Sequence, residues 1–333
     1  MSNPFFIEGP ATIGVSGGRT SGELLKRILD AHGGRLPSDV FPSFQNTGEE
    51  DERTLVFLAE MQRRWGVEIT WLEYNDVFNI EDYRRADGSL STKRRKRNLQ
   101  NRDEWGFDIV SFETACRNGE PYDRMLAYYA EYRKQIKGLP PVLPNVPQRL
   151  CTAYLKIKIN QRWMNVLGHR EYTSISGIRA DEPHRYARMM AQNQNHKLPY
   201  EYDCPLYHAG VTSGDILSAW RGRDFDLGLD PNSEAGNCGL CYLKRKGVLV
   251  RLMREKIAAN NGIVPAELIR WRRREQESGQ VFRRDRPNFE SLINEALTGE
   301  TDGNLNLFDD VSTAFAGRQH DGTYVHGFHS HGR

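Results

Sequence analysis

The sequence lacks the long apolar runs of membrane proteins and secreted precursors. No stretch approaches the roughly 20 consecutive apolar residues that a membrane-spanning helix needs. The opening segment, MSNPFFIEGP, has neither the basic start nor the continuous apolar centre of a signal peptide. The protein is therefore expected to be cytoplasmic, with no membrane partner.

A large excess of charge of either sign is also absent. The 333 residues include 46 Lys and Arg against 44 Asp and Glu, a net charge of +2, so the overall field gives no argument for nucleic-acid binding. Two basic runs stand out locally, KRRKR at 93–97 and RWRRR at 270–274. The second, in an apparent helix with acidic neighbours, is interpreted as a solvated face. For the first, a mobile phosphate-binding loop and a solvated loop are equally good interpretations.

Cysteine is scarce and odd in number. Five cysteines in an expected reducing compartment argue against a disulfide framework and direct attention to metal or thiol chemistry. Cys238 and Cys241 form a CGLC pair, whose spacing lets both sulfurs reach one metal or cluster. Together with Cys151 they could hold a cluster with one open iron. Cys204, as a fourth ligand, would close a cluster or complete a zinc site, and Cys116 is interpreted as a plain thiol.

Alternating apolar segments predict an α/β fold. Strands over 12–15, 40–48, 67–74 and 172–176 alternate with helices over 22–31 and 53–65, the pattern of a doubly wound, mostly parallel, Rossmann-like sheet. The nucleotide-binding domain is predicted to span 1–230, with a polar, basic insertion at about 76–148. A cysteine-containing loop and helical extension follow at 231–298, with a helix over 248–260. The His- and Gly-rich tail, 299–333, is predicted to be poorly ordered.

The turn after the first predicted strand lacks both standard phosphate-binding patterns, GxxxxGK[ST] and GxGxxG. SGGRTS at 16–21 nevertheless has two glycines that let an anion approach the backbone, and a following helix that presents free N–H groups. Three hydroxyls can donate hydrogen bonds and Arg19 adds a positive charge. The strand before and the helix after favour a phosphate site over a plain Gly-Gly turn with a Ser or Thr cap.

Five segments in order give the chain a resemblance to a known family. SGGRTS resembles the SGGxDS loop of the PP-loop ATP pyrophosphatases and the related phosphoadenosine phosphosulfate (PAPS) reductases, in the adenine nucleotide α-hydrolase-like superfamily. QNTGEEDERTLVFL, RLCTAYLKI, GIRADEPHR and YDCPLYHAGVTSGDILSAW resemble later motifs of that family. Thr20 stands where the pyrophosphatases usually carry Asp, which leaves the handling of pyrophosphate and Mg²⁺ open.

The resemblance implies an adenine nucleotide, ATP or alternatively PAPS or APS, bound with Mg²⁺ at the carboxyl ends of the strands. Arg19, Lys156 and Arg179 are the implied catalytic residues, acting by positioning and charge stabilisation. A surface salt-bridge loop is the alternative interpretation of GIRADEPHR. The implied nucleotide contacts are Ser16, Gly17, Gly18, Arg19, Thr20, Ser21, Asn46, Thr47, Gly48, Gly177, Arg179, Asp181, Glu182 and Arg185.

The resemblance also bears on the cysteines. In cluster-bearing sulfonucleotide reductases a Cys-Cys pair stands where this chain has Leu150 and Cys151, and a CxxC pair follows. Three matching cysteines resemble the set of PP-loop sulfur-transfer enzymes, which hold a [4Fe–4S] cluster with a free site. Zinc and an ordinary thiol pair stay open as alternatives, and Cys204 stays open as a fourth ligand.

The implied reaction follows from a further absence. PAPS-type reductases use a cysteine near the carboxyl terminus, and this sequence has none after Cys241. The resemblance therefore favours an ATP pyrophosphatase that adenylylates an acceptor and then transfers sulfur. A nucleic-acid acceptor, a sulfur-donor protein and a homo-oligomer are compatible with the sequence. The alternatives are a sulfonucleotide reductase that uses an external thiol and a non-catalytic nucleotide- or nucleic-acid-binding module.

Overall fold

The computed structural model describes residues 3–194, 198–231, 236 and 238–299. Within them a six-stranded sheet has the order β4-β3-β2-β1-β5-β6. β4 runs antiparallel to β3, and the other neighbouring pairs are parallel. The strands are β1 Ala11–Gly14, β2 Val40–Asn46, β3 Thr70–Tyr74, β4 Phe107–Val110, β5 Tyr172–Ile175 and β6 Tyr200–Asp203.

Helices flank the sheet and continue beyond it. The α-helices are α1 Arg19–Ala31, α2 Glu52–Trp65, α3 Glu120–Glu131, α4 Lys158–Val166, α5 Pro183–Gln194, α6 Pro205–His208, α7 Ser213–Arg221, α8 Lys246–Ala259, α9 Ala266–Ser278 and α10 Phe289–Thr298. Short 3₁₀ turns cover Ile80–Tyr83 and Arg102–Glu104, and π-helical turns cover Tyr132–Ile136 and Thr152–Ile157. No helix in the described part of the chain is long and apolar enough to cross a membrane.

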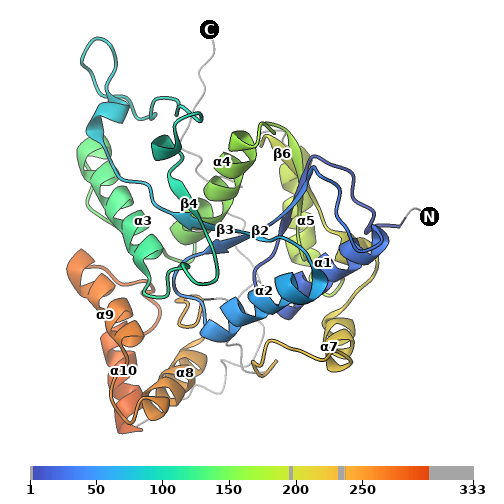
Figure 1. The fold of residues 1–333 in the computed structure, drawn as a ribbon. Coiled ribbons are helices and arrows are strands. Elements are labelled where there is room, and N and C mark those ends of the chain that lie inside the picture. Colours follow the sequence, from blue (N-terminus) through green and yellow to red (C-terminus); the bar gives the residue numbers. More distant parts are fainter. Residues whose placement is uncertain (1–2, 195–197, 232–235, 237, 300–333) are drawn as a thin grey trace.

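Two helical layers enclose the sheet. In Figure 1, α4 lies above β2 and β3 while α2 lies below them. On the α4 face, Asn160 accepts hydrogen bonds from Thr12 of β1 and Ser43 of β2. On the other side α1, α2 and α7 meet closely, because a Cβ at Gly22 would lie 2.8 Å from Trp220 and 2.9 Å from the sulfur of Met61. The sequence prediction of an α/β fold with a mostly parallel sheet is confirmed.

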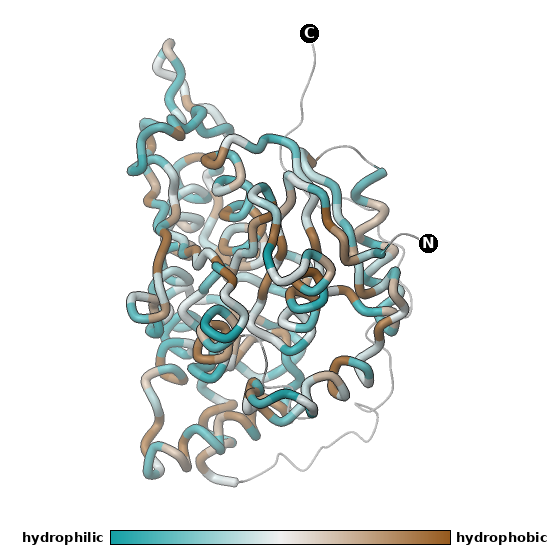
Figure 2. The backbone as a smooth tube through the Cα atoms, turned by 45° about the vertical axis from the view of Figure 1, so that its right-hand side comes forward, coloured by the Kyte–Doolittle hydropathy of each residue, from teal (hydrophilic) through white to brown (hydrophobic). Residues whose placement is uncertain are grey.

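The hydrophobic core follows the strands. Ala11 and Ile13 of β1 are completely buried, as are Leu24, Leu25 and Ile28 of α1. Figure 2 shows the hydrophobic segments concentrated inside the molecule, whereas the loop after Ile80–Tyr83, projecting at the top, is mostly hydrophilic. The apolar periodicity that predicted these elements therefore marks the buried faces.

The segment 76–148 is more regular than the sequence indicated. Its strand β4 extends the sheet at the edge, and α3 contacts β3. Antiparallel pairing fits an edge position, where a strand needs only one partner. The helical extension after residue 231 comprises α8, α9 and α10, and the prediction of a helix over 248–260 matches α8 within two residues. Residues 300–333 of the predicted tail lie outside the described residues.

The solvated-face interpretation of RWRRR needs correction, and the solvated loop at KRRKR proves to be tied down by ion pairs. Arg274 of RWRRR is buried rather than solvated, and Arg270 is mostly buried. In KRRKR, Arg94 and Arg95 bind the buried carboxylate of Asp82, and Arg97 binds that of Asp76. Periodicity and charge cannot reveal these partners, which come from other parts of the chain. The arginines of the first run are largely used to stabilise the fold.

Candidate functional site

The candidate nucleotide loop lies at the point where the sheet changes direction. From β1 the chain adds β2 and β3 on one side and later returns to add β5 on the other. In open α/β sheets, ligands bind at the carboxyl ends of the strands at such a switch point. The backbone N–H of Val15 donates to Ser43 of β2, and a Cβ at Gly14 would lie 3.6 Å from the carbonyl oxygen of Ile175 in β5. Residues 15–21 therefore lie where the fold favours a ligand.

Internal hydrogen bonds hold this loop in shape. The hydroxyl of Ser21 accepts from the backbone N–H of Ser16 at 3.1 Å and donates to the carbonyl of Gly18 at 3.0 Å. Gly18 is the N-cap of α1 and makes no side-chain cap. The first N–H groups of the helix are thus left to an anion rather than to a capping side chain.

Gly17 is required by both its conformation and its surroundings. Its φ is +73°, in the left-handed region that favours glycine. A Cβ would lie 2.3 Å from Cγ2 of Thr54 and 3.2 Å from Leu58, both on α2. The loop therefore lies tightly against α2.

The segment after β5 meets the loop. The guanidinium of Arg179 donates to the hydroxyl of Thr20 at 3.2 Å and to the carboxylate of Asp181 at 2.9 Å. Gly177 packs beside Thr20, since a Cβ there would lie 3.6 Å from its methyl group. Glu182 caps this turn by accepting from the backbone N–H of Arg179, and it also pairs with Arg185. The structure thus brings these predicted residues together with the loop.

The guanidinium of Arg19 is already bound within the protein, whereas its predicted role requires it to stabilise charge on a phosphate. Its guanidinium donates two hydrogen bonds to Asp226, at 2.5 and 2.6 Å, and a third to the carbonyl of Leu229 at 2.7 Å. The same residue's carbonyl accepts from the indole N–H of Trp220 at 2.8 Å. A bidentate carboxylate satisfies most of the charge of an arginine. Arg19 therefore anchors the segment after α7.

The residues at the end of β2 are buried and structural. The amide of Asn46 donates to Glu73 at 2.6 Å and to the carbonyl of Cys116 at 2.8 Å, and it accepts from Gly48. The hydroxyl of Thr47 donates to Glu50 at 2.8 Å. Asn46 and Thr47 are 0% and 1% exposed. They shape the edge of the site and are not available to contact a nucleotide directly in this arrangement.

Three of the predicted metal ligands are electrostatic neighbours of Lys156. Burial lowers the pKa of Lys156, but its acidic neighbours, Glu50 and the thiols of Cys238, Cys151 and Cys241, outweigh burial, and the pKa is raised. Lys156 has no hydrogen bond or ion pair with any residue that the structure describes. The two segments that carry the thiols, the start of the π-helical turn before α4 and the CGLC loop, meet where the sulfur of Cys151 lies 3.6 Å from the hydroxyl of Tyr242.

The CGLC loop is attached to the end of β2. Glu50 and Cys238 form an isolated antiparallel bridge, and the N–H of Gly239 donates to the carbonyl of Glu49 at 2.9 Å. The sulfur of Cys238 lies 3.4 Å from the hydroxyl of Thr47. These contacts place the cysteine pair directly beside the Thr47–Glu50 turn, next to the strand that neighbours the nucleotide loop.

Cys204 does not belong to this group. It is buried at the start of α6, and its charged neighbours are Asp203, Arg185 and Glu182. Burial, together with Asp203, raises the pKa of Cys204 to about 12. Burial also raises the pKa of Cys238 and Cys241, so all three are protonated thiols at neutral pH without a metal.

One feature of this region would suit a bound iron–sulfur cluster, namely a buried hydroxyl without a hydrogen-bond partner. The hydroxyl of Tyr122, beside Cys151 and Cys241, is buried with no partner among the described residues. A buried hydroxyl without a hydrogen bond is costly unless a bound group satisfies it. As arranged here, the described residues contain no group of three or more His, Cys, Asp or Glu set up to hold a metal ion.

Several residues of this region were missed by the sequence analysis. Glu49 is completely buried in its side chain and binds Arg274 at 2.7 Å, and Arg270 lies 3.5 Å from the same carboxylate oxygen. Arg274 also binds Asp123 of α3 at 2.6 Å. The run of four acids after NTG was the only signal that more than a turn lies there. Its partners, more than 200 residues away, could not be read from the sequence.

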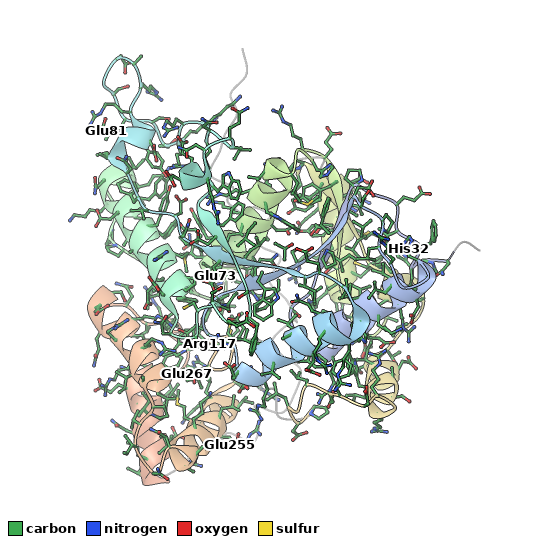
Figure 3. The ribbon with its side chains drawn as sticks, in the orientation of Figure 1. His32, Glu73, Glu81, Arg117, Glu255 and Glu267 are labelled. Carbon is green, nitrogen blue, oxygen red and sulfur yellow. The ribbon has the colours of Figure 1, made fainter. Side chains whose placement is uncertain are left out.

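A cavity of about 360 Å³ lies beside β3, β4 and the start of α3. Glu73 and Asp108 are among its lining residues, with Arg102, Glu120 and Arg124. Figure 3 labels Glu73 of β3, Arg117 and Glu267 of α9 one below the other, from the sheet down to the C-terminal helices. Burial raises the pKa of Glu73, which accepts from Asn46 and from the N–H of Cys116. Glu73 thus connects the lining of this cavity to the end of β2.

Comparison with known proteins gave no match. No family, no curated protein and no solved structure is recognisably similar to this chain. The family resemblance of the motifs accordingly remains a prediction, and the functional argument is made from the site itself.

Proposed function

We propose that this chain is a PP-loop enzyme that binds an adenine nucleotide on residues 16–21 and adenylylates an acceptor. The observation that carries the proposal is the meeting of Arg179 and Thr20 beside an uncapped helix N-terminus, at the switch point of the sheet. A loop of this kind offers backbone N–H groups, hydroxyls and one guanidinium to a phosphate chain. These are the groups that bind and orient a triphosphate.

The reaction transfers AMP from ATP. An oxygen of the acceptor forms a bond to the α-phosphorus, the bond from that phosphorus to the bridging oxygen breaks, and pyrophosphate leaves while the acceptor proton passes to solvent. Arg179 stabilises the charge that develops on the phosphate oxygens, and the N–H groups of α1 do the same. Lys156, an unpaired amine, serves as a second cation beside the site. Arg19 holds the loop through Asp226 and acts as a positioning residue.

Mg²⁺ fits the Arg179 loop less well than the resemblance implied. The oxygens of Asp181 bind Arg179 and the N–H of Ser213, and those of Glu182 bind Arg179 and Arg185. A cation at these carboxylates would compete with arginines that already neutralise them. The nucleotide's own phosphates are therefore expected to supply most ligands of Mg²⁺.

Cys151, Cys238 and Cys241 would hold a [4Fe–4S] cluster, with zinc as the alternative. The convergence of the three thiols on Lys156 and the orphaned hydroxyl of Tyr122 support this part of the proposal. When bound, such a cluster supplies an open iron that can carry the sulfur for transfer. Lys156 would balance the negative charge of the thiolates. The ion-paired KRRKR run gives no support to a nucleic-acid acceptor, or to a binding module that uses this run.

The test compares Arg179→Ala with Arg63→Ala. Arg179 touches the loop, whereas Arg63 of α2 is 64% exposed in its side chain, pairs with Glu60 and serves as the matched control. Calorimetry should show ATP affinity reduced about tenfold or more in Arg179→Ala, since a hydrogen bond to a charged group is lost. Arg63→Ala should bind like the wild type, and pyrophosphate release should fall only in Arg179→Ala.

Other outcomes would redirect the assignment. Equal ATP affinity in both variants, or none in the wild type, contradicts the proposed site. Tight ATP binding without pyrophosphate release for any acceptor supports a binding module. Sulfite released from PAPS or APS with an external thiol supports the reductase.

A further inference from the structure

Two carboxylates on neighbouring strands line the cavity beside β3, β4 and α3. Glu73 of β3 and Asp108 of β4 lie directly opposite each other in the antiparallel ladder, so their side chains share one face of the sheet. Both are among the residues that line this cavity of about 360 Å³. Like charges at directly opposite positions destabilise a strand pair. A cation between the two carboxylates would offset this repulsion.

Glu73 is fixed in place with one oxygen left over. Its Oε1 accepts from the amide of Asn46 and from the backbone N–H of Cys116, both at 2.6 Å. The residue is only 9% exposed, and its Oε2 has no hydrogen-bond donor among the described residues. Unlike Oε2 of Glu49, this oxygen is not sealed off from solvent. Oε2 is therefore the atom of Glu73 that is left for a ligand in the cavity.

Two further charged groups of the lining lack a partner. Asp108 makes no side-chain hydrogen bond or ion pair within the ranges that the structure describes. The guanidinium of Arg102 lies 5.8 Å from the centre of the Trp105 ring and has no ion pair with any carboxylate of the described chain. Glu120 and Arg124, in contrast, pair with each other at 2.6 Å. The cavity thus offers two carboxylates and one guanidinium to a ligand.

We propose that this cavity binds a small zwitterion of the amino-acid type, with its ammonium between Glu73 and Asp108 and its carboxylate on Arg102. An ammonium has three N–H donors, enough for both carboxylates, and a guanidinium can bind a carboxylate through two parallel hydrogen bonds. The positive charge also favours the ionised form of Glu73, whose pKa burial raises. The inference does not rest on the proposed nucleotide loop.

The size and the apolar part of the cavity suit such a ligand. A volume of about 360 Å³ is at the small end of the range for ligand pockets. Ile109, Val110 and Pro121 contribute apolar surface to the lining, and Ile109 is 45% exposed. An aliphatic chain would cover this surface and remove it from water. An amino acid with an aliphatic side chain is accordingly the expected ligand.

The experiment screens the full chain, without nucleotide, against the free proteinogenic amino acids, β-alanine and γ-aminobutyrate by saturation-transfer NMR. The compound with the strongest signal is then titrated by calorimetry, beside its N-acetyl derivative and its methyl ester. The N-acetyl derivative lacks the ammonium and should bind at least about tenfold more weakly, since its charge-assisted hydrogen bonds are lost. The methyl ester should lose about tenfold because it cannot pair with Arg102.

Substitutions of the lining test the same contacts from the side of the protein. Asp108→Asn and Glu73→Gln should each reduce the affinity about tenfold, and Arg102→Ala should reduce it for the amino acid but not for its methyl ester. Glu73→Gln keeps an oxygen that can accept the same two hydrogen bonds, and thermal unfolding checks that the fold is retained. Asp103→Asn is the matched control, because this exposed aspartate is close in the chain and does not line the cavity. It should bind like the wild type.

Absence of saturation transfer from every compound in the wild type would overturn the inference. An affinity unchanged in both Asp108→Asn and Glu73→Gln would do the same, because the ligand would then lie elsewhere. An N-acetyl derivative that binds as well as the amino acid would exclude the ammonium contact. ATP affinity and pyrophosphate release are measured on separate samples, so this inference and the proposed function can fail independently.

Discussion

A single buried arginine determines how the C-terminal helices join the sheet. Arg274 of α9 is 2% exposed in its side chain and binds Glu49 after β2 and Asp123 of α3. One nitrogen of Arg274 and one oxygen of Glu49 have no partner among the described residues. A buried pair of this kind adds little net stability, but removing one member leaves an uncompensated charge.

Arg274→Met is therefore expected to destabilise the protein by about 3–5 kcal/mol, since Glu49 is left buried with only Arg270 nearby. The measurement is urea unfolding. Arg273→Ala is the control, because this neighbour is about half exposed and binds Asp123 at the surface, where a pair contributes about 1 kcal/mol or less. Equal losses in the two variants would contradict the role given to the buried pair.

The same substitution should make stability depend more strongly on pH. Burial raises the pKa of Glu49, and Arg274 and Arg270 lower it in part. A carboxyl whose pKa is higher in the folded than in the unfolded protein loses stability as pH rises from the unfolded to the folded pKa. Removing Arg274 raises the folded pKa further, so the deficit of Arg274→Met should be smaller at about pH 5 than at about pH 8. A deficit that does not change with pH would contradict this.

At the scale of elements, the junction of β1 and α1 is fixed by its contact with α2. Gly17 has a positive φ and no room for a Cβ next to Thr54, whereas Gly18 has a φ of −96° and its Cβ would meet nothing closer than 3.7 Å. Two adjacent glycines thus have different physical requirements. The first shapes the loop and the second leaves the helix N-terminus free.

Gly17→Ala should accordingly destabilise the protein by about 1–3 kcal/mol through overpacking, with added strain from its φ, and should weaken ATP binding. Gly18→Ala should be close to wild type in both respects. Thermal unfolding and calorimetry measure the two effects. Adding Thr54→Ala, which removes the clashing methyl group, should restore part of the stability lost in Gly17→Ala. Similar behaviour of the two glycine variants would argue against the tight contact.

At the scale of the whole molecule, the helical extension contacts the rest of the protein around the Thr47–Glu50 turn, which follows β2. The CGLC loop bridges Glu50, and α9 binds Glu49 through Arg274. In Figure 1, α9 lies below α3, which contributes Asp123 and Tyr122 to the same region. The extension thus completes the candidate site.

We expect the sheet and the extension to unfold in one cooperative transition for this reason. Fluorine-labelled tryptophan resolves Trp71 of β3 and Trp271 of α9 by NMR during urea unfolding. The two signals should change together in the wild type and separate in Arg274→Met. Separate transitions in the wild type would mean that the extension is an independent unit.

The sequence by itself determined four of the six strands and the helices α1, α2 and α8. Local chemistry is sufficient there, because a buried strand needs an apolar run and an amphipathic helix needs a repeat of 3.6 residues. The edge strand β4 was missed because it is only four residues long and its one polar residue, Asp108, interrupts the apolar run and lines a cavity with Ile109 and Val110.

Only the tertiary structure decided which side chains share the site. It brought Cys151 to Tyr242, directly after the CGLC pair, kept Cys204 apart beside Asp203, and buried Arg274. Helical periodicity reveals which face of a helix is apolar, but not what that face meets. Glu49 and Arg274 are 225 residues apart, and only the folded chain brings one charge to the other.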